Sequence, residues 1–436
     1  MIESLHKAER PTGYSKKFWL LMSVFYLLFV IRNLIGLSFP VEIFLILVTL
    51  MACLFDEEEI VALVVSFIPL YPAFQNKIAI LLCLAVLIIK CYRQIKILPF
   101  TLAGVLLILW EFFHHNIGTF SFVEGFASFA ELIFVMVLAC IQRKKTTNMV
   151  ALSRVYGITC IVCFVILLAN TFQVTHMNFF QLLGSGYRLG ELKALESLGY
   201  QFSYNPNGLG FICNLGIGIL LLNFYHKKGN LLDALMIVVM LFIGTLTVSR
   251  TFLILFALTV ILFIMLQNVD FFKRLRSIFL LFVALGMVLL LIYALFPNIF
   301  LNYLERFMVE DVTNGRSYLS DFYNSFIFSS FDRLFFGVGM QDIVGKMRLF
   351  ENIDILCPHN GYQEIVVAWG IPGLILMGIF MSGIVMSAMK KRATKKIEWT
   401  HFMVLLLLLV NIIAGQFFTS SFRMISLVLV YESVKS

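Results

Sequence analysis

Two side chains with useful chemistry lie in one polar stretch, residues 297–360, late in a mostly apolar chain. Arg316 follows the turn signal Asn314-Gly315, and His359 follows a proline just before an apolar run. A guanidinium carries a fixed positive charge and binds a phosphate through two parallel hydrogen bonds. An imidazole titrates near neutral pH and can take a proton from a hydroxyl. This stretch therefore combines an anion-binding group with a candidate general base.

Arg250 and an asparagine-rich turn are further candidates. Arg250 stands between two long apolar runs with almost no polar loop to shelter it. A charge in such a position usually faces a partner, a cavity or the membrane interface, and a guanidinium there suits a lipid-linked phosphate. Tyr204, Asn205 and Asn207 open another apolar run, where a phenol and two amides could bind sugar hydroxyls.

Each candidate also has a plainer interpretation. Arg250 could extend to the lipid headgroups, and Arg316 could form a surface salt bridge with Glu310 or Asp311. His359 could cap a helix or line an interface, and asparagines at the start of an apolar run are typical of caps and turns. The choice between the functional and the plainer interpretation depends on the secondary-structure elements that carry these residues.

Those elements are predicted to be membrane-spanning helices. Hydrophobic residues make up 61% of the chain and charged residues 13%, which is too apolar for one soluble core. The apolar runs are continuous rather than alternating, which indicates helices instead of barrel strands. We expect an all-α, polytopic transmembrane bundle of about 12 to 14 spans, forming a single integral membrane domain over residues 1–436.

The candidate helices lie near residues 18–36, 40–54, 60–74, 78–90, 97–112, 119–141, 151–172, 203–223, 231–249, 251–267, 277–296, 361–387, 401–418 and 421–434. Between the last long spans, residues 297–360 form a long loop. Residues 317–331 of that loop alternate apolar and polar side chains at helical spacing, which predicts a short amphipathic helix against the membrane face.

Basic residues assign sides to the spans. Lysines and arginines recur in every second connection, and positive residues stay cytoplasmic. This parity predicts cytoplasmic termini and an extracytoplasmic loop at 297–360. It also places four separate features on the same outer face, namely Arg250, Arg316, His359 and the turn that begins at Tyr204. The net charge of +8 therefore reflects topology, and we expect no binding of nucleic acid.

No pattern in the sequence indicates a metal, redox or nucleotide site. Cys160 and Cys163 form a CxxC, but it lies within an apolar span without a second pair or a nearby histidine. Gly337-Val338-Gly339 lacks the strand-turn-helix context of a nucleotide fingerprint. We expect no metal and no cofactor. The acidic run Asp56 to Glu59 suggests no function.

Six short motifs follow one another over roughly residues 200 to 390. They are Asn205-Pro206-Asn207, Ser249-Arg250, Gly315-Arg316, Gly337-Val338-Gly339, His359-Asn360 and Gly370-Ile371-Pro372-Gly373. In the order and the shared membrane side of these motifs, the chain resembles the O-antigen polymerase and O-antigen ligase family.

Members of that family are bacterial plasma-membrane glycosyltransferases that use undecaprenyl-diphosphate-linked glycans and need no metal. The resemblance implies that Arg250 and Arg316 contact the diphosphate. It implies that His359 activates the acceptor, with inversion at the anomeric carbon. We expect Asn360 to bind substrate, as we do Tyr204, Asn205 and Asn207.

The motifs do not separate the polymerases of that family from its ligases. From the general appearance of the chain we expect a polymerase of capsular, O-antigen or exopolysaccharide repeat units. Its partners would be lipid-linked donor and acceptor, the bilayer, and a flippase and a chain-length regulator. One alternative is a ligase that transfers finished glycan to an acceptor. Another is a flippase, a transporter for the same units. A third is a structural or sensory subunit. A deletion strain should accumulate single units on the outer leaflet for a polymerase and on the inner leaflet for a flippase.

Overall fold

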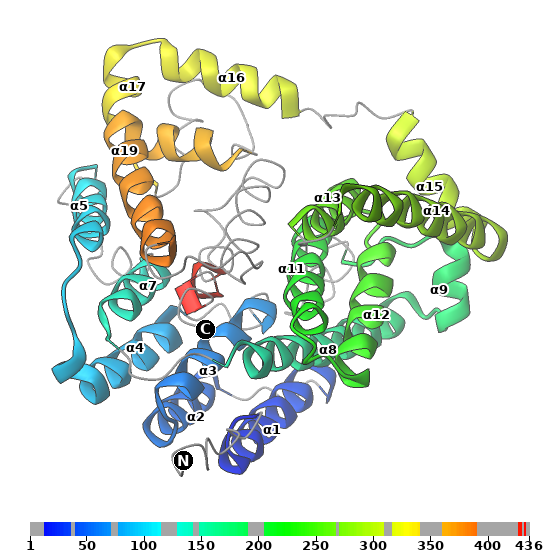
Figure 1. The fold of residues 1–436 in the computed structure, drawn as a ribbon, viewed down its shortest axis with the longest axis horizontal. Coiled ribbons are helices and arrows are strands. Elements are labelled where there is room, and N and C mark those ends of the chain that lie inside the picture. Colours follow the sequence, from blue (N-terminus) through cyan, green and yellow to red (C-terminus); the bar gives the residue numbers. More distant parts are fainter. Residues whose placement is uncertain are drawn as a thin grey trace.

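The computed structural model describes residues 13–35, 40–70, 77–114, 129–142, 148–190, 205–266, 270–308, 316–340, 360–389, 426–429 and 431–432. Tyr204, His359 and the span predicted at 401–418 lie outside these residues, as does most of the span predicted at 421–434. The described ranges are helical, and their β-type pairing is an isolated bridge between Ile95 and Ile141. The predicted all-α class is therefore confirmed (Figure 1).

The first half of the chain packs around one buried helix. Its helices are α1 (Lys16–Val30), α2 (Val41–Leu54), α3 (Glu57–Leu70), α4 (Lys77–Cys91), α5 (Pro99–Phe113), α7 (Ala130–Cys140) and α8 (Met149–Thr175). Short π and 3-10 segments, Ile31–Ile35 and Tyr92–Gln94, extend α1 and α4. Helix α3 is buried from Glu59 to Leu70, because α2, α4 and α8 all pack against it.

The second half gathers into two groups. Its helices are α9 (Phe179–Ser185), α11 (Pro206–Tyr225), α12 (Leu231–Leu246), α13 (Arg250–Leu266), α14 (Phe271–Leu295), α15 (Pro297–Met308), α16 (Arg316–Phe328), α17 (Phe331–Phe336) and α19 (Gly361–Met389). Figure 1 shows α9 and α11 to α15 on one side of the molecule, and α16, α17 and α19 on the other side beside α5.

Several helices have the length and apolar character of membrane spans. Among the described residues, four helical stretches meet both conditions: Lys16–Ile35, Met149–Thr175, Pro206–Tyr225 and Gly361–Ile384. Shorter apolar helices, α2, α5, α7, α12 and α13, accompany them. A hydrocarbon core of about 30 Å needs roughly 20 helical residues, so these stretches can cross a bilayer. The chain is a polytopic membrane protein, and the number of spans stays a prediction.

The acidic run between α2 and α3 has a structural role. The Asp56 carboxylate accepts the Glu59 N–H at 2.9 Å, and the Glu59 carboxylate accepts the Asp56 N–H at 3.2 Å. Glu59 also accepts the Ser15 N–H at 3.1 Å, just before α1. These bonds satisfy N–H groups at the start of two helices that have no partner within the helix.

The polar stretch after α14 contains several helices. α16 covers most of the range where an amphipathic helix was predicted, which confirms a helix there, and its place against the membrane face stays a prediction. The same stretch holds another amphipathic helix, α15, whose position the sequence did not indicate. It packs on α9, where the Asn302 amide donates to the Gly186 carbonyl at 2.9 Å. The Tyr303 hydroxyl donates to the Thr245 carbonyl at 2.7 Å, which ties α15 to the end of α12.

Helix α19, predicted as one continuous span, is broken at Gly370, whose φ of 65° and ψ of −162° are not helical. Pro372 lacks an N–H, so the Ala368 carbonyl has no helical donor four residues further on. An unpaired carbonyl inside a membrane protein costs several kcal/mol, on the order of a lost hydrogen bond in an apolar medium. Other parts of the chain must therefore supply donors at this break.

The Gly337-Val338-Gly339 segment supplies them. The Val338 N–H donates to the Val367 carbonyl at 2.9 Å, and the Gly339 N–H donates to the Ala368 carbonyl at 2.7 Å. This approach is so close that a Cβ on Gly337 would overlap the Ala368 carbonyl. The two glycine motifs noted in the sequence are therefore structural partners.

Alanine at Gly370 should destabilise the protein strongly. The backbone conformation alone would cost about 1–3 kcal/mol for a residue with a side chain. A Cβ there would also overlap the Phe335 carbonyl oxygen. Gly378 is the matched control on the same helix, because a Cβ there meets no atom within 4 Å. We expect Gly370→Ala to lower the melting temperature and the yield of purified protein, and Gly378→Ala to change neither. Equal melting temperatures for the two variants would contradict this account.

Candidate functional site

Two of the sequence motifs meet at the start of α11. The Asn205 side chain caps this helix by accepting the Asn207 N–H at 2.9 Å. The Asn207 side-chain oxygen in turn accepts the Ser249 hydroxyl at 2.7 Å. Ser249 is fully buried, and its hydroxyl also accepts the Phe252 N–H at 3.3 Å. The Asn-Pro-Asn and Ser-Arg motifs, which are 42 residues apart, are thus joined directly.

Arg250 is the first residue of α13 and is half-buried. The turn before it is sharp, since Val248 adopts a φ of 45° that residues other than glycine rarely take. The start of a helix favours negative charge, because its first N–H groups have no partner within the helix. The arginine charge adds to this effect. The α12–α13 turn is therefore suited to an anion.

Sequence reasoning missed Arg188, which stabilises the same turn. The Arg188 Nε donates to the Thr247 carbonyl at 3.0 Å, and the Leu189 N–H donates to the Leu246 carbonyl at 2.9 Å. These donors satisfy carbonyls at the end of α12 that lack a partner within the helix. The signal in the sequence was weak, consisting of one arginine in the connection at 173–202.

A second group of candidates lies at the starts of α16 and α19. Asn360 caps α19, since its side-chain oxygen accepts the Tyr362 N–H at 2.9 Å and the Gln363 N–H at 3.5 Å. The Gln363 side chain donates to the Ser320 carbonyl and to the Asn324 side-chain oxygen, both at 2.9 Å. This amide therefore joins the first turn of α19 to the middle of α16.

Arg316 is the first residue of α16, about one helical turn before Ser320. Figure 1 shows α16 and α19 starting at the same side of this part of the molecule. Arg316 thus begins α16 and Asn360 caps α19, two helices that Gln363 joins through Ser320 and Asn324. His359 and Tyr204 fall outside the described residues.

The described candidates thus form two groups. Asn205, Asn207 and Arg250 meet where α11 and α13 begin, and Arg316 and Asn360 begin α16 and α19. The convergence of both groups on one outer surface stays a prediction. Within the described ranges, no three His, Cys, Asp or Glu side chains are grouped closely enough to hold a metal ion.

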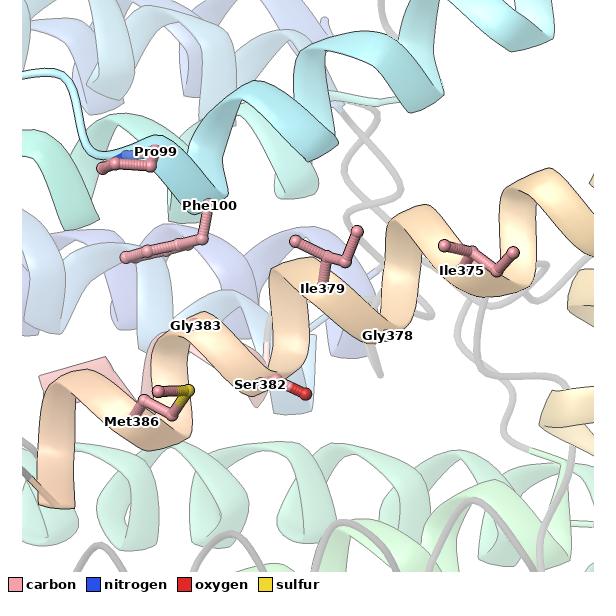
Figure 2. A pocket seen from close by; sticks show the side chains of 8 residues that line it. All are labelled: Pro99, Phe100, Ile375, Gly378, Ile379, Ser382, Gly383 and Met386. Atoms are coloured by element: carbon pink, nitrogen blue, oxygen red, sulfur yellow. The ribbon is translucent and has the colours of Figure 1, made fainter.

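An apolar groove of about 570 Å³ lies between α5 and α19 (Figure 2). Its lining residues are Pro99, Phe100, Ile375, Gly378, Ile379, Ser382, Gly383 and Met386. Pro99 begins α5 and Met386 lies near the end of α19, so the groove is at the other end of α19 from Asn360. It offers neither a charge nor a base, and we do not assign the chemistry to it.

The Asn207–Ser249 contact gives a test by double-mutant cycle. Because one hydrogen bond joins the two side chains, Ser249→Ala and Asn207→Ala should each cost about 0.5–1.5 kcal/mol. The double variant should cost clearly less than the sum of the two. Thermal unfolding of purified protein measures this coupling.

The matched control is the buried Asn214–Thr259 pair, which joins α11 to α13 with a bond of 2.9 Å within the helices. Alanine variants of this pair should lower stability to a similar extent. Strictly additive costs for Asn207 and Ser249 would contradict the contact.

Comparison with known proteins supports the sequence resemblance. Residues 235–378 match the family model described as O-antigen ligase. The match runs from α12 into α19 and includes Arg250, Arg316, His359 and Asn360. No curated protein and no solved structure matches the chain. Over residues 235–378, about a third of its length, this chain is therefore similar to the O-antigen ligase family.

Proposed function

We propose that the protein is a membrane glycosyltransferase that polymerises undecaprenyl-diphosphate-linked repeat units into a capsular, O-antigen or exopolysaccharide chain. One observation supports this most. The two arginines singled out by their chemistry, Arg250 and Arg316, are each the first residue of a helix inside the family match. A helix start and a guanidinium together provide positive potential suited to a diphosphate.

In the proposed reaction, a hydroxyl of the acceptor sugar attacks the anomeric carbon of the donor glycan. A new C–O bond forms on one face as the bond to the diphosphate oxygen breaks on the other, so the configuration inverts. His359 accepts the hydroxyl proton, and the leaving diphosphate takes the bonding electron pair. The product is the longer glycan, and the leaving group is free polyprenyl diphosphate.

The arginines act on the leaving group in this scheme. Negative charge grows on the diphosphate oxygen as its bond breaks, and fixed cations that bind this charge better in the transition state lower the barrier. Arg250 is well placed for such a role, because Ser249, Asn207 and Arg188 constrain its turn. The arginine charges would make a divalent cation unnecessary.

We also propose that the protein resides in a bacterial plasma membrane with both termini in the cytoplasm. The segment that carries Arg316 and His359 would then face outward, where lipid-linked units are joined. A flippase would supply the units, and a chain-length regulator would set the length of the product. The alternation of basic connections along the chain supports this sidedness.

A transporter is the main rival from another class, because transporters bind their substrates at broken helices near the midplane. Helix α19 is broken, but the carbonyls at the break accept hydrogen bonds from other parts of the protein. The Val338 and Gly339 N–H groups donate to the Val367 and Ala368 carbonyls. The Trp110 indole N–H donates to the Trp369 carbonyl at 3.0 Å. A break that is filled in this way supports a structural role. A ligase that transfers finished glycan to another acceptor remains the alternative within the family.

Single substitutions test the assigned roles. His359→Ala should lower turnover by about 10²- to 10⁴-fold, the range for loss of a general base. Arg316→Ala and Arg250→Ala should abolish polymer ladders at unchanged membrane levels. Arg250→Lys should restore activity only in part, because an ammonium lacks the planar fork.

Arg333 on α17 is the control arginine. Its guanidinium lies 4.2 Å from the ring centre of Phe326 and donates to Ser329 at 2.8 Å, an arrangement that stabilises the local structure. Arg333→Ala should keep most of the polymerising activity. Full-length polymer from both His359→Ala and Arg316→Ala would refute the proposal.

A further inference from the structure

The apolar groove between α5 and α19 lies along a helix that can span the membrane. Six of its eight lining residues belong to α19, from Ile375 to Met386. The candidate span in this helix covers Gly361–Ile384. The groove volume of about 570 Å³ is within the range of small-molecule sites, roughly 300–1,000 Å³. The groove is therefore large enough for a ligand and lies where the hydrocarbon tails of lipids surround the protein.

Two glycines of α19 shape this groove (Figure 2). A Cβ on Gly383 would overlap the Phe100 ring, so this glycine allows the start of α5 to lie directly on α19. The Phe100 ring also packs against Phe380, with ring centres 6.1 Å apart. Five residues before Gly383, a Cβ on Gly378 would meet no atom within 4 Å. Three apolar side chains that also line the groove are about half exposed: Ile375, Ile379 and Met386.

The length of the groove matches one leaflet of a bilayer. From Ile375 to Met386, α19 rises by roughly 16 Å at 1.5 Å per residue. This is about half of the 30 Å hydrocarbon core, which is the depth that one acyl chain occupies. Lipid tails are as apolar as the lining, so the groove alone would not select one kind of lipid. Selection requires a contact with the headgroup.

A positive charge lies at one end of the groove. Phe100 packs at Gly383, whereas Trp110 donates to Trp369, so α5 and α19 run antiparallel. The start of α5 is therefore at the same end as Met386, where the candidate span ends. Lys96 is exposed and precedes Pro99, the first residue of α5, by three residues. Three residues span at most about 11 Å, which is within reach of a lipid headgroup.

Other charges near this segment have partners within the protein. The Arg93 guanidinium lies 5.3 Å from the centre of the Tyr92 ring and donates to its hydroxyl at 2.7 Å. The Glu57 carboxylate accepts the Gln94 amide at 3.3 Å, five residues before the start of α5. Lys96 is the charged residue nearest to the groove along the chain, and its positive charge favours an anionic headgroup.

We propose that the groove between α5 and α19 binds an anionic phospholipid, with one acyl chain along residues 375–386 and the phosphate headgroup beside Lys96. The proposal does not rest on the proposed glycosyl transfer. Basic groups between membrane helices on the cytoplasmic side are a known setting for anionic lipids. Under the proposed sidedness, the start of α5 faces the cytoplasmic leaflet.

Photocrosslinking of the full chain tests where the lipid binds. The probe is phosphatidylglycerol with a diazirine in one acyl chain, added to wild-type protein in neutral detergent. We expect crosslinks in peptides covering residues 97–103 and 375–386. Unlabelled phosphatidylglycerol should displace the probe at a concentration at least about 5-fold lower than phosphatidylcholine does, the equivalent of about 1 kcal/mol for one basic residue.

Gly378→Leu should abolish crosslinking of these peptides, because its side chain extends into the open space of the groove. Gly286→Leu on α14 is the matched control, since a Cβ there also meets no atom within 4 Å. It should crosslink as the wild type does. The melting temperatures of both variants, measured without lipid, should be close to that of the wild type.

Lys96→Gln tests the headgroup contact without filling the groove. The concentration of phosphatidylglycerol that displaces half of the probe should rise about 5-fold. The concentration of phosphatidylcholine should not change. Lys228→Gln is the matched control, because Lys228 is exposed in the connection between α11 and α12, and it should alter neither concentration.

Several results would overturn the site. These are wild-type crosslinking in Gly378→Leu and equal displacement of the probe by the two phospholipids. Displacement by undecaprenyl phosphate at a lower concentration than by phosphatidylglycerol would assign the groove to the tail of a polyprenyl lipid instead. If Gly378→Leu does not yield folded protein, Lys96→Gln decides, and unchanged competition by phosphatidylglycerol in that variant would contradict the proposal.

Discussion

The structure depends on one constraint, that backbone polar groups surrounded by hydrocarbon must find partners within the protein. Most of them do so within helices. Within the described ranges, exceptions lie at helix ends and at the break in α19, and there the sequence provides specific donors and acceptors. Asn205 and Asn360 cap α11 and α19, Arg188 satisfies the end of α12, and the Gly-Val-Gly segment pairs with the carbonyls near Gly370. Several of the motifs that carry the family resemblance thus have a structural role that does not depend on catalysis.

The same contacts determine where charge can be placed. Arg250 follows a turn that is fixed from α11 by Asn207 and from the α9 side by Arg188. Arg316 begins a helix joined to α19 through Gln363. A preorganised positive charge is what a developing diphosphate anion requires. Placing a charged side chain beside lipid costs free energy, and the proposed mechanism gives these charges a function.

The fold class could be predicted from the sequence because continuous apolar runs have few alternatives in water or lipid. The α16 helix was also predictable from its local periodicity. The pairing of Asn207 with Ser249 could not be predicted, because it joins residues 42 positions apart and each motif alone is typical of a cap or turn. The hydrogen bond from the Met340 N–H to the buried Glu111 carboxylate was missed for a similar reason, since the two residues are 229 positions apart. Gly370 in α19 was read as part of a span because glycine and proline also occur in unbroken membrane helices.

The central claim is that Arg250 and His359 face the same, outer side of the membrane. Cysteine can be placed at each position, one at a time, in a variant whose eight native cysteines are replaced. Intact cells are then treated with a membrane-impermeant maleimide, and a cysteine at Lys228 serves as the inner control. The account predicts labelling at positions 250 and 359 before permeabilisation, and at 228 only afterwards. Labelling of positions 250 and 359 from opposite sides would contradict it.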